Sequence, residues 1–349
     1  MHSSQVGRQG SPRRILSAVA LLVLGILLWQ QFNRSFKPHD YFGLPPRHSP
    51  RPQPDLTVTS DVPDGPSALS QRNTPRSRPD LRVTSGVNIF TSQTTTAKYC
   101  LDYEVPGKKG LKLCTYNPKS DFTGVKVAAY HSFNFQTMAY MFNEMAKRKI
   151  ADLTNEPLSF VDIGCNVGTY TVAAAVLGYK VLAVDAMQTT LDLLASSLRL
   201  NNLTSDVTMV QNVISDRRGE FRMSIVDERN MGTARVLSKT PANVRQTQPI
   251  KAIYMDDLIP YLPSRNVFIK MDIEGSEGRA FRHADNFFKQ ANVVGMLVEY
   301  FIVKRNATDR DTLINFMTDR GYKPYHEKNK ELLSPKKNMS WPQNVLWLI

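Results

Sequence analysis

From residue 158 onward, short apolar runs with strand character alternate with segments of helical pattern. Several of these runs are apolar along nearly their whole length, as expected of strands buried on both faces of a sheet. Strands that alternate with helices predict an α/β fold: a doubly wound, mostly parallel sheet with helices on both faces. The runs are LSFVDIG (158–164), KVLAVD (180–185), VTMVQN (207–212), NVFIKMD (266–272) and VVGMLVEY (293–300).

The segments between and after these runs complete the expected order of elements. Residues 219–226 alternate between polar and apolar, which predicts an antiparallel excursion after the third strand. Short strands around YKPYH and NVLWLI are expected to close the fold. Helices are predicted at TYTVAAAVLG (169–178), residues 190–200, SEGRAFRHADNFFKQ (276–290) and residues 309–320.

The first strand leads into a glycine-rich loop, FVDIGCNVGTY (160–170). In a doubly wound sheet, ligands bind beyond the carboxyl ends of the strands, where this loop lies. The dinucleotide fingerprint G-x-G-x-x-G fails, because Asn166 and Thr169 stand where its second and third glycines belong. A phosphate-binding P-loop fails as well, since no Gly-Lys-Ser/Thr follows.

The charge of nearby residues further limits which ligand this loop can bind. A carboxylate at Asp162 would repel a pyrophosphate, whereas it attracts the sulfonium and ammonium groups of S-adenosylmethionine. Asp185 ends the second strand and is placed to accept hydrogen bonds from both ribose hydroxyls, a feature shared with NAD enzymes. We therefore expect S-adenosylmethionine as the cofactor, bound by Asp162, Gly164, Asn166, Gly168 and Asp185. A structural glycine turn without a ligand is the alternative.

Four segments, in their order and spacing, resemble the FkbM-type methyltransferases: DIGCNVGTYT, AVDA, QNVISDRRGEF and KMDIEGSEGRAF. The resemblance covers about residues 158–300. It implies a class I methyltransferase fold that uses S-adenosylmethionine, with O-methyl transfer as the usual reaction. AVDA departs from the family pattern, in which Glu-Pro is frequent, so the ribose contact is expected to be the aspartate Asp185.

The segment KMDIEGSEG (270–278) gathers acidic residues at the end of a central strand and the start of a helix. On a strand, residues 270, 272 and 274 point to one side. We expect Asp272 to act as the general base toward an acceptor hydroxyl and Glu274 to orient the substrate. In the structural alternatives, Glu277 favours the positive end of the helix and Lys270 neutralises Asp272.

No metal site is predicted, because the acidic residues show no metal-ligand spacing. A cation held by Asp272 and Glu274 together with Asp256 or Asp257 is the alternative.

A few further residues remain as weaker candidates for the site. His131 and His326 are possible bases, and Glu299 and Tyr300 end the next central strand near the same rim. Cys165 is expected to be a packed residue of the loop and not a nucleophile.

The N-terminus carries an uncharged apolar segment, ILSAVALLVLGILLW (15–29), which extended to residue 32 reaches the length of a short membrane span. No small-x-small cleavage site follows it, so we expect an uncleaved signal anchor at 15–32; secretion after signal cleavage is the alternative. The arginines before it predict a cytoplasmic tail (1–14) and a lumenal remainder, which is a single-pass type II topology.

Residues 33–95 contain ten prolines and no long apolar run, which predicts a disordered, extended lumenal stem. Two polar copies within it, RPQPDLTVTS (51–60) and RSRPDLRVTS (76–85), are interpreted as a duplicated spacer. The methyltransferase domain is then expected at 96–349. Because anchor, stem and catalytic domain follow the architecture of Golgi glycan-modifying enzymes, we expect a Golgi location and a glycan hydroxyl as acceptor.

The cysteines and the N-glycosylation sequons give information on the cellular compartment of the domain. Cys100 and Cys114 flank a strand-turn-strand pattern around PGKKG, so a disulfide across a hairpin is one interpretation. Sequons at Asn202, Asn306 and Asn338 would all be lumenal. The net charge of +13 includes no Lys/Arg run or interleaved aromatics in the C-terminal part, which disfavours a nucleic-acid partner.

The sequence thus predicts a membrane-anchored lumenal O-methyltransferase for a glycan hydroxyl. A methyltransferase for a lipid or small molecule, and a non-catalytic lumenal binding module that retains the fold, are the alternatives.

Overall fold

The computed structural model describes residues 86–92, 97–151, 156–237 and 243–349. The predicted tail, the anchor at 15–32 and both copies of the repeat lie outside these residues. Within the described ranges, no helix combines the length and the apolar character needed to cross a membrane.

A seven-stranded sheet forms the centre of the domain, and its order confirms the predicted doubly wound, mostly parallel architecture. The strands from β12 to β5 are parallel, whereas β14 pairs antiparallel with both β12 and β13. In spatial order the strands are β13 (Lys323–His326), β14 (Asn344–Leu348), β12 (Asn292–Glu299), β11 (Asn266–Met271), β3 (Ser159–Ile163), β4 (Val181–Asp185) and β5 (Val207–Gln211).

The strand order reverses between β3 and β11. The chain moves outward from β3 through β4 to β5 and then returns to pair β11 with the other side of β3. Every residue of β3 and of β11 is buried, which explains why their sequences are almost continuously apolar. Such a reversal opens a crevice beyond the carboxyl ends of the two strands, where ligands bind in doubly wound sheets.

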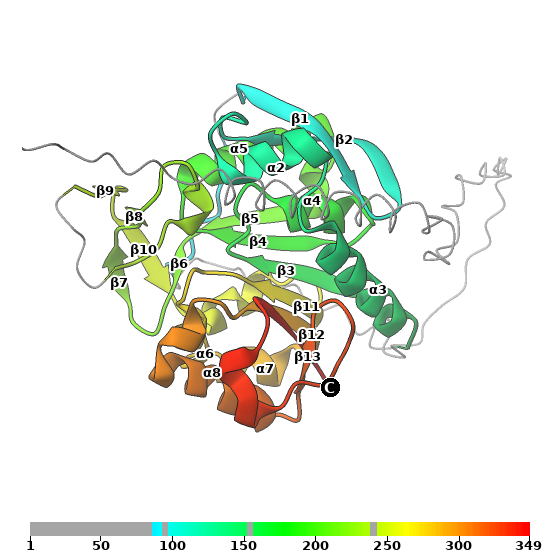
Figure 1. Ribbon diagram of the computed structural model, residues 1–349, viewed down its shortest axis with the longest axis vertical. Helices are drawn as coiled ribbons and strands as arrows, with labels where there is room; N and C mark the ends of the chain where they lie inside the picture. The colour runs from blue at the N-terminus through cyan, green and yellow to red at the C-terminus, as the bar shows by residue number, and fades with distance from the viewer. Residues whose placement is uncertain (1–85, 93–96, 152–155, 238–242) are drawn as a thin grey trace, which may run out of the picture. The chain divides into compact units, whose positions relative to one another are not determined.

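Helices cover both faces of this sheet (Figure 1). Alternate side chains of β3 point to opposite faces, so Phe160 joins one apolar cluster and Val161 the other. One face carries α2 (Phe122–Tyr130), α3 (Phe135–Ala151), α4 (Thr169–Val176) and α5 (Gln188–Leu200), and the other carries α6 (Glu277–Phe281), α7 (Asp285–Gln290) and α8 (Ala307–Thr318).

The predicted antiparallel excursion is present as two small sheets. The first has the order β6-β10-β7 and the second pairs β8 with β9. The strands are β6 (Val213–Ile214), β7 (Gly219–Phe221), β8 (Ser224–Ile225), β9 (Arg245–Gln246) and β10 (Ile250–Ile253). Short 3-10 helices lie between them and elsewhere, among them η3 (Met231–Thr233) and η4 (Met255–Tyr261).

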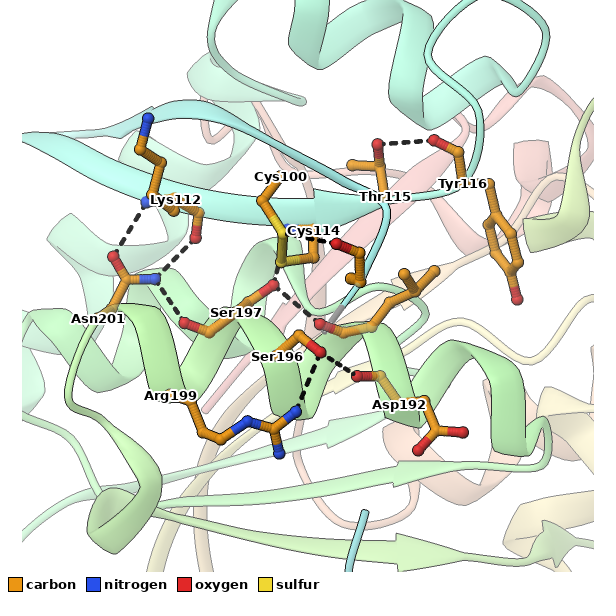
Figure 2. The surroundings of a disulfide bond; sticks show 12 residues. Cys100, Lys112, Cys114, Thr115, Tyr116, Asp192, Ser196, Ser197, Arg199 and Asn201 are labelled. Atoms are coloured by element: carbon orange, nitrogen blue, oxygen red, sulfur yellow. Dashed lines mark hydrogen bonds between the residues drawn. A yellow bond between two sulfur atoms is a disulfide. The ribbon is translucent and has the colours of Figure 1, made fainter. Parts of the chain in front are cut away.

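A disulfide joins Cys100 and Cys114 across the antiparallel hairpin of β1 (Tyr99–Val105) and β2 (Lys108–Thr115), which confirms that interpretation. Figure 2 shows how α5 holds this hairpin. The backbone N–H of Cys114 donates to Ser197 Oγ at 2.8 Å, and Asn201 bonds to both the N–H and the C=O of Lys112. These bonds fix β2 to α5, and Tyr103 of β1 also donates a hydrogen bond to Thr169 O of α4.

Two boundaries differ from the prediction. Residues 86–92, expected to belong to the stem, run antiparallel to β5: Phe90 N–H donates to Met209 O, and Val87 is buried in the core. The ordered domain therefore reaches back at least to residue 86. The single helix expected at 276–290 is divided into α6 and α7.

Gly164 gives a test of how closely β3 and β11 meet. A Cβ at this position would lie 1.7 Å from the backbone oxygen of Asp272, and φ is +77°. We expect Gly164→Ala to lower the free energy of unfolding by at least about 2 kcal/mol, measured by denaturant unfolding. Gly321 is a matched control, because φ is +84° there but nothing lies within 4 Å of the added Cβ. Gly321→Ala should cost only about 1 kcal/mol, and equal losses in the two variants would contradict the close approach.

Candidate active site

A cavity of about 370 Å³ lies where β3, β4, β11 and β12 end. This is the edge of the sheet that the sequence predicted for the ligand. Of the seven residues predicted for the site, five line the cavity: Gly164, Asn166, Asp185, Asp272 and Glu274.

The glycine-rich loop and the end of β4 are tied together through one carboxylate. Asn166 adopts a left-handed backbone with φ of 49°, and its N–H donates to Asp185 Oδ2 at 2.9 Å. Asp185 Oδ1 accepts from the N–H of Met187 at 2.8 Å. Burial raises the pKa of Asp185 to about 6, even though these two backbone donors lower it. Each oxygen keeps a lone pair for a further donor from a ligand.

Asp162 and Gly168 occupy different places from those predicted. Asp162 is completely buried behind the cavity wall and accepts a hydrogen bond from Thr171 Oγ1 at 2.6 Å. Gly168 caps the N-terminus of α4, where an added Cβ would lie 2.3 Å from Leu194 Cδ1. Neither residue lines the cavity, and both lie against the elements that support the loop.

Lys270 links the two sides of the crevice. Its buried ammonium donates to the carbonyl of Gly164 at 3.1 Å and lies 3.3 Å from Asp272 Oδ2 and 3.8 Å from Asp162 Oδ1. Burial opposes its charge, but Asp272 and Asp162 together raise the pKa of Lys270. Neutralisation of Asp272, stated above as a structural alternative, is therefore present in the structure.

Acidic side chains gather beside this lysine at the ends of β11 and β12. Asp272, Glu277 and Glu299 each place a carboxylate oxygen so that the three oxygens lie within 4.8 Å of one another. Burial, followed by repulsion from neighbouring carboxylates such as Asp272, raises the pKa of Glu274 to about 8 and that of Glu299 to about 9. Glu274 has φ of 55°, a left-handed conformation that turns the chain sharply after β11.

The predicted alternative metal set is not assembled. Asp256 accepts from Phe287 N–H at 2.7 Å, and Asp257 accepts from Tyr254 N–H and pairs with Arg218 at 2.6 Å. Both carboxylates therefore stabilise η4 and its neighbours.

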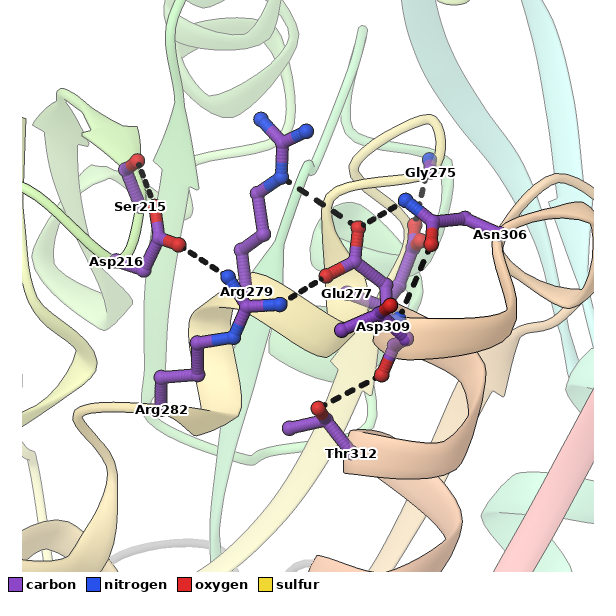
Figure 3. A network of polar contacts seen from close by, with 10 residues as sticks. Ser215, Asp216, Gly275, Glu277, Arg279, Arg282, Asn306, Asp309 and Thr312 are labelled. Atoms are coloured by element: carbon purple, nitrogen blue, oxygen red, sulfur yellow. Dashed lines mark hydrogen bonds and ion pairs between the residues drawn. The ribbon is translucent and has the colours of Figure 1, made fainter.

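The packing of α6 against α8 fixes the position of Glu277, the first residue of α6. Figure 3 shows Asp309 at the centre of this contact, accepting from Arg282 Nη2 at 2.6 Å and from Asn306 Nδ2 at 2.7 Å. Gly278 permits the close approach, because an added Cβ would lie 2.1 Å from the backbone oxygen of Asp309. Glu277 Oε1 then accepts from the N–H groups of Ile273 and Gly275 and holds the loop after β11.

Of the residues named from the sequence as weaker candidates for the site, some line the cavity and others do not. Glu299 lines the cavity and so does Cys165, which is buried as expected. Among the described cavity-lining residues, neither His131 nor His326 appears, and Tyr300 packs against Trp341 instead. None of the histidines that the structure describes lines this cavity.

Sequence reasoning missed the residues that form the outer walls. Phe122 begins α2, Phe133 lies between α2 and α3, and Phe301 follows β12. Met231 and Gly232 come from η3, and an added Cβ at Gly232 would lie 2.5 Å from Asn166 Nδ2. None of these residues lies in a motif with recognisable spacing, so no signal in the sequence marked them.

The charges of the wall fit S-adenosylmethionine. Among the described residues that line the cavity, four are carboxylic acids and one is a cation: Asp185, Asp272, Glu274, Glu299 and Lys270. Glu274 and Glu299, with pKa values raised to about 8 and 9, are mainly protonated at neutral pH, so the attraction for a sulfonium or ammonium group comes from Asp185 and from Asp272, which is paired with Lys270. The carboxylates at the cavity wall are therefore residues other than Asp162.

Comparison with protein families gives a match over the same part of the chain. Residues 162–324 match the family model described as the methyltransferase FkbM domain, which confirms the resemblance seen in the sequence. S-adenosylmethionine is accordingly the cofactor. A search of curated protein sequences found no match.

Solved structures similar to this chain include three methyltransferases. The tRNA (uracil-54, C5)-methyltransferase of Pyrococcus abyssi, in complex with S-adenosyl-L-homocysteine, is 13% identical with a TM-score of 0.35, covering 75% of this chain and 50% of that one. The O-methyltransferase of Bacillus cereus, in complex with SAH, is 12% identical with a TM-score of 0.32, covering 66% and 98%. The precorrin-6y C5,15-methyltransferase of Geobacter metallireducens GS-15 is 13% identical with a TM-score of 0.29, covering 59% and 85%.

Removal of the buried ammonium tests its role. Lys270→Met leaves Asp162 and Asp272 without their cation, so we expect the free energy of unfolding to fall by about 3–5 kcal/mol in denaturant unfolding. Lys180 is the matched control, because its pair with Asp206 lies at the surface. Lys180→Met should cost less than about 1 kcal/mol. Similar small losses in both variants would show that Lys270 does not hold the crevice together.

Proposed function

We propose that this FkbM-domain chain, an S-adenosylmethionine-dependent methyltransferase, methylates a glycan hydroxyl in the Golgi lumen while anchored in the membrane by residues 15–32. The observation that carries the proposal is the composition of the cavity. Its wall combines Asp185 in a cofactor region, Asp272 and Glu274 in an acidic region, and exposed aromatic rings.

The cofactor region is assigned to Gly164, Asn166 and Asp185. Gly164 lets the backbone turn at the crevice, and Asn166 N–H holds the Asp185 carboxylate in place. The ionised Asp185 carboxylate accepts hydrogen bonds from the ribose hydroxyls of the cofactor. Asp162 contributes indirectly by balancing the charge of Lys270.

This assignment predicts a pH dependence of cofactor binding. The carboxyl of Asp185, with a pKa near 6, is ionised at about pH 7.5 and becomes protonated as the pH falls through about 6. Because a charged acceptor strengthens hydrogen bonds, the Kd for S-adenosylmethionine should rise about tenfold by about pH 5, measured by calorimetry. Asp185→Asn should bind weakly at both values. A wild-type Kd that does not change, or an Asp185→Asn variant with the same pH dependence, would contradict this role.

The aromatic rings favour an acceptor with flat apolar surfaces between its hydroxyls. Phe122 is 46% exposed and Phe301 is 44% exposed, although both line the cavity. Phe122 also meets Phe133 edge to face, with ring centroids 6.2 Å apart. Exposed aromatic side chains of this kind supply contact area for the C–H faces of sugar rings, while nearby carboxylates accept hydrogen bonds from sugar hydroxyls.

The acidic region supplies the proton acceptor. We assign this role to Glu274 and substrate orientation to Asp272, the reverse of the roles expected from sequence, because Asp272 is ion-paired with Lys270. When bound, the cofactor supplies a methyl carbon attached to a positively charged sulfur. Glu274 accepts the proton of the acceptor hydroxyl as the hydroxyl oxygen bonds to that carbon; the C–S bond breaks and its electron pair stays on sulfur.

Two features support the lumenal location. The Cys100–Cys114 disulfide is of the kind that persists in oxidising compartments. The sequon asparagines Asn202 and Asn306 are both exposed, as acceptors of N-linked sugars need to be.

The glycan acceptor is tested in cells that lack the protein and are then supplied with the full-length chain. Mass spectrometry should show O-methylated glycans lost without the protein and restored by the wild type. Glu274→Gln should restore at least about a hundredfold less, because proton transfer by a positioned side chain contributes that much. Glu327→Gln, a buried carboxyl outside the cavity wall, should restore them fully. Unchanged glycans together with loss of a methylated lipid or small molecule would overturn the glycan acceptor.

A further inference from the structure

We infer that Asp272 and Glu299, which line the cavity, form with the fully buried Glu277 a binding site for a hard divalent cation such as Mg²⁺, Mn²⁺ or Ca²⁺. The site itself is argued from the geometry of these side chains. Its contribution to methyl transfer rests on the proposed function.

The geometry suits one ion shared by three ligands. One oxygen from each carboxylate lies within 4.8 Å of the other two. Ca²⁺ holds its ligands at 2.3–2.6 Å, so ligands on opposite sides of it stand roughly 4.6–5.2 Å apart, and Mg²⁺ needs slightly less. A cation among the three oxygens therefore reaches all of them with small adjustments of the side chains.

Unpartnered oxygens point to the same conclusion. Glu299 is 6% exposed and lines the cavity, yet its Oε2 has no hydrogen-bond partner among the described residues. Glu277 is fully buried, and its Oε2 also lacks a partner, although Oε1 accepts from two backbone N–H groups. A buried carboxylate oxygen without a donor is costly, and a coordinated cation removes that cost.

Two buried carboxylates elsewhere among the described residues have this cost met by cationic side chains. Glu144, which is 1% exposed, pairs with Lys147, Arg148 and Lys330 at 2.8–3.3 Å. Asp309 pairs with two arginines in the contact shown in Figure 3. At the acidic region of the cavity, Lys270 pairs only with Asp272 among the three proposed ligands. The positive charge that this cluster lacks is what a divalent cation provides.

The ligand set defines the class of ion. Three carboxylates offer only oxygen atoms, which hard cations prefer; a site for zinc normally includes Cys or His. The ligands lie at the ends of neighbouring elements: Glu299 ends β12, Asp272 directly follows β11, and Glu277 begins α6. Because three protein ligands leave further positions open toward the cavity, water or an acceptor hydroxyl completes the coordination.

The site also explains how the acceptor is held beside Glu274. With the acceptor oxygen at an open position of the cation, its hydroxyl becomes more acidic and its orientation is fixed. Glu274 accepts the hydroxyl proton, the oxygen bonds to the methyl carbon, and the bond from that carbon to sulfur breaks with its electron pair on sulfur. Asp272 then orients the substrate through the ion that it binds.

Binding of Mn²⁺ to the full-length chain tests the site without reference to activity. After treatment with a chelator and its removal, titration with Mn²⁺, followed by the electron paramagnetic resonance signal of free Mn²⁺, should show one bound ion per chain. Glu299→Gln and Glu277→Gln should each weaken binding at least about tenfold, since each removes a charged ligand. Glu327→Gln is the matched control, because Glu327 Oε2 is buried without a hydrogen bond, with His326 Nδ1 3.5 Å away, and lies outside the cluster. This variant should bind Mn²⁺ like the wild type.

A second measurement keeps the test valid if a glutamine variant folds poorly. Mn²⁺ should raise the thermal midpoint of the wild type and of Glu327→Gln, and raise it less in the shortened variant Glu299→Asp. Absence of saturable Mn²⁺, Mg²⁺ and Ca²⁺ binding in the wild type overturns the inference, and the carboxyls then share protons. If glycan methylation persists after chelation, the inferred role of the ion in methyl transfer fails while the proposed function stands. If the chain binds Mn²⁺ as expected but does not bind S-adenosylmethionine, the proposed function fails while the cation site stands.

Discussion

The buried ammonium of Lys270 is the interaction on which the crevice depends. It lies between β3 and β11, at the one place in the sheet where the strand order reverses. There it offsets two carboxylates and binds the carbonyl of Gly164, so that a residue of one strand fixes the loop that follows the other. Without the ammonium of Lys270, the carboxylates of Asp162 and Asp272 would repel each other.

The sequence predicted the sheet and the cofactor loop because both follow from local rules. β3 and β11 are mostly apolar because both of their faces are covered, with Asp162 and Lys270 among the exceptions. The glycine loop departs from the pyrophosphate fingerprints at single positions that can be read directly from the sequence. Asp185 was located by the same reasoning, since it ends a strand whose boundary is visible. The family match covers the part of the chain that carries this loop and Asp185.

The remainder of the site depends on packing between distant segments. Asp162 was misplaced because its direction is set by the alternation along β3: it shares the face of Phe160 and therefore meets Thr171 of α4 and not the cavity. Phe122 and Phe301 are separated by most of the domain in sequence and meet only in the folded wall. Glu299 was anticipated only as a strand end, since its unpaired oxygen has no counterpart in sequence.

The contact between α6 and α8 has a consequence for the maturation of the chain. The Asn306 side chain belongs to a sequon, yet its Nδ2 atom also donates to Asp309 in the packing that positions Glu277. An N-linked sugar is attached to that same nitrogen and replaces one of its two hydrogens. Glycosylation at Asn306 would thus leave a single hydrogen on Nδ2 to maintain the bond to Asp309. The same nitrogen would then carry the surface sugar and help to hold the helix packing that positions Glu277.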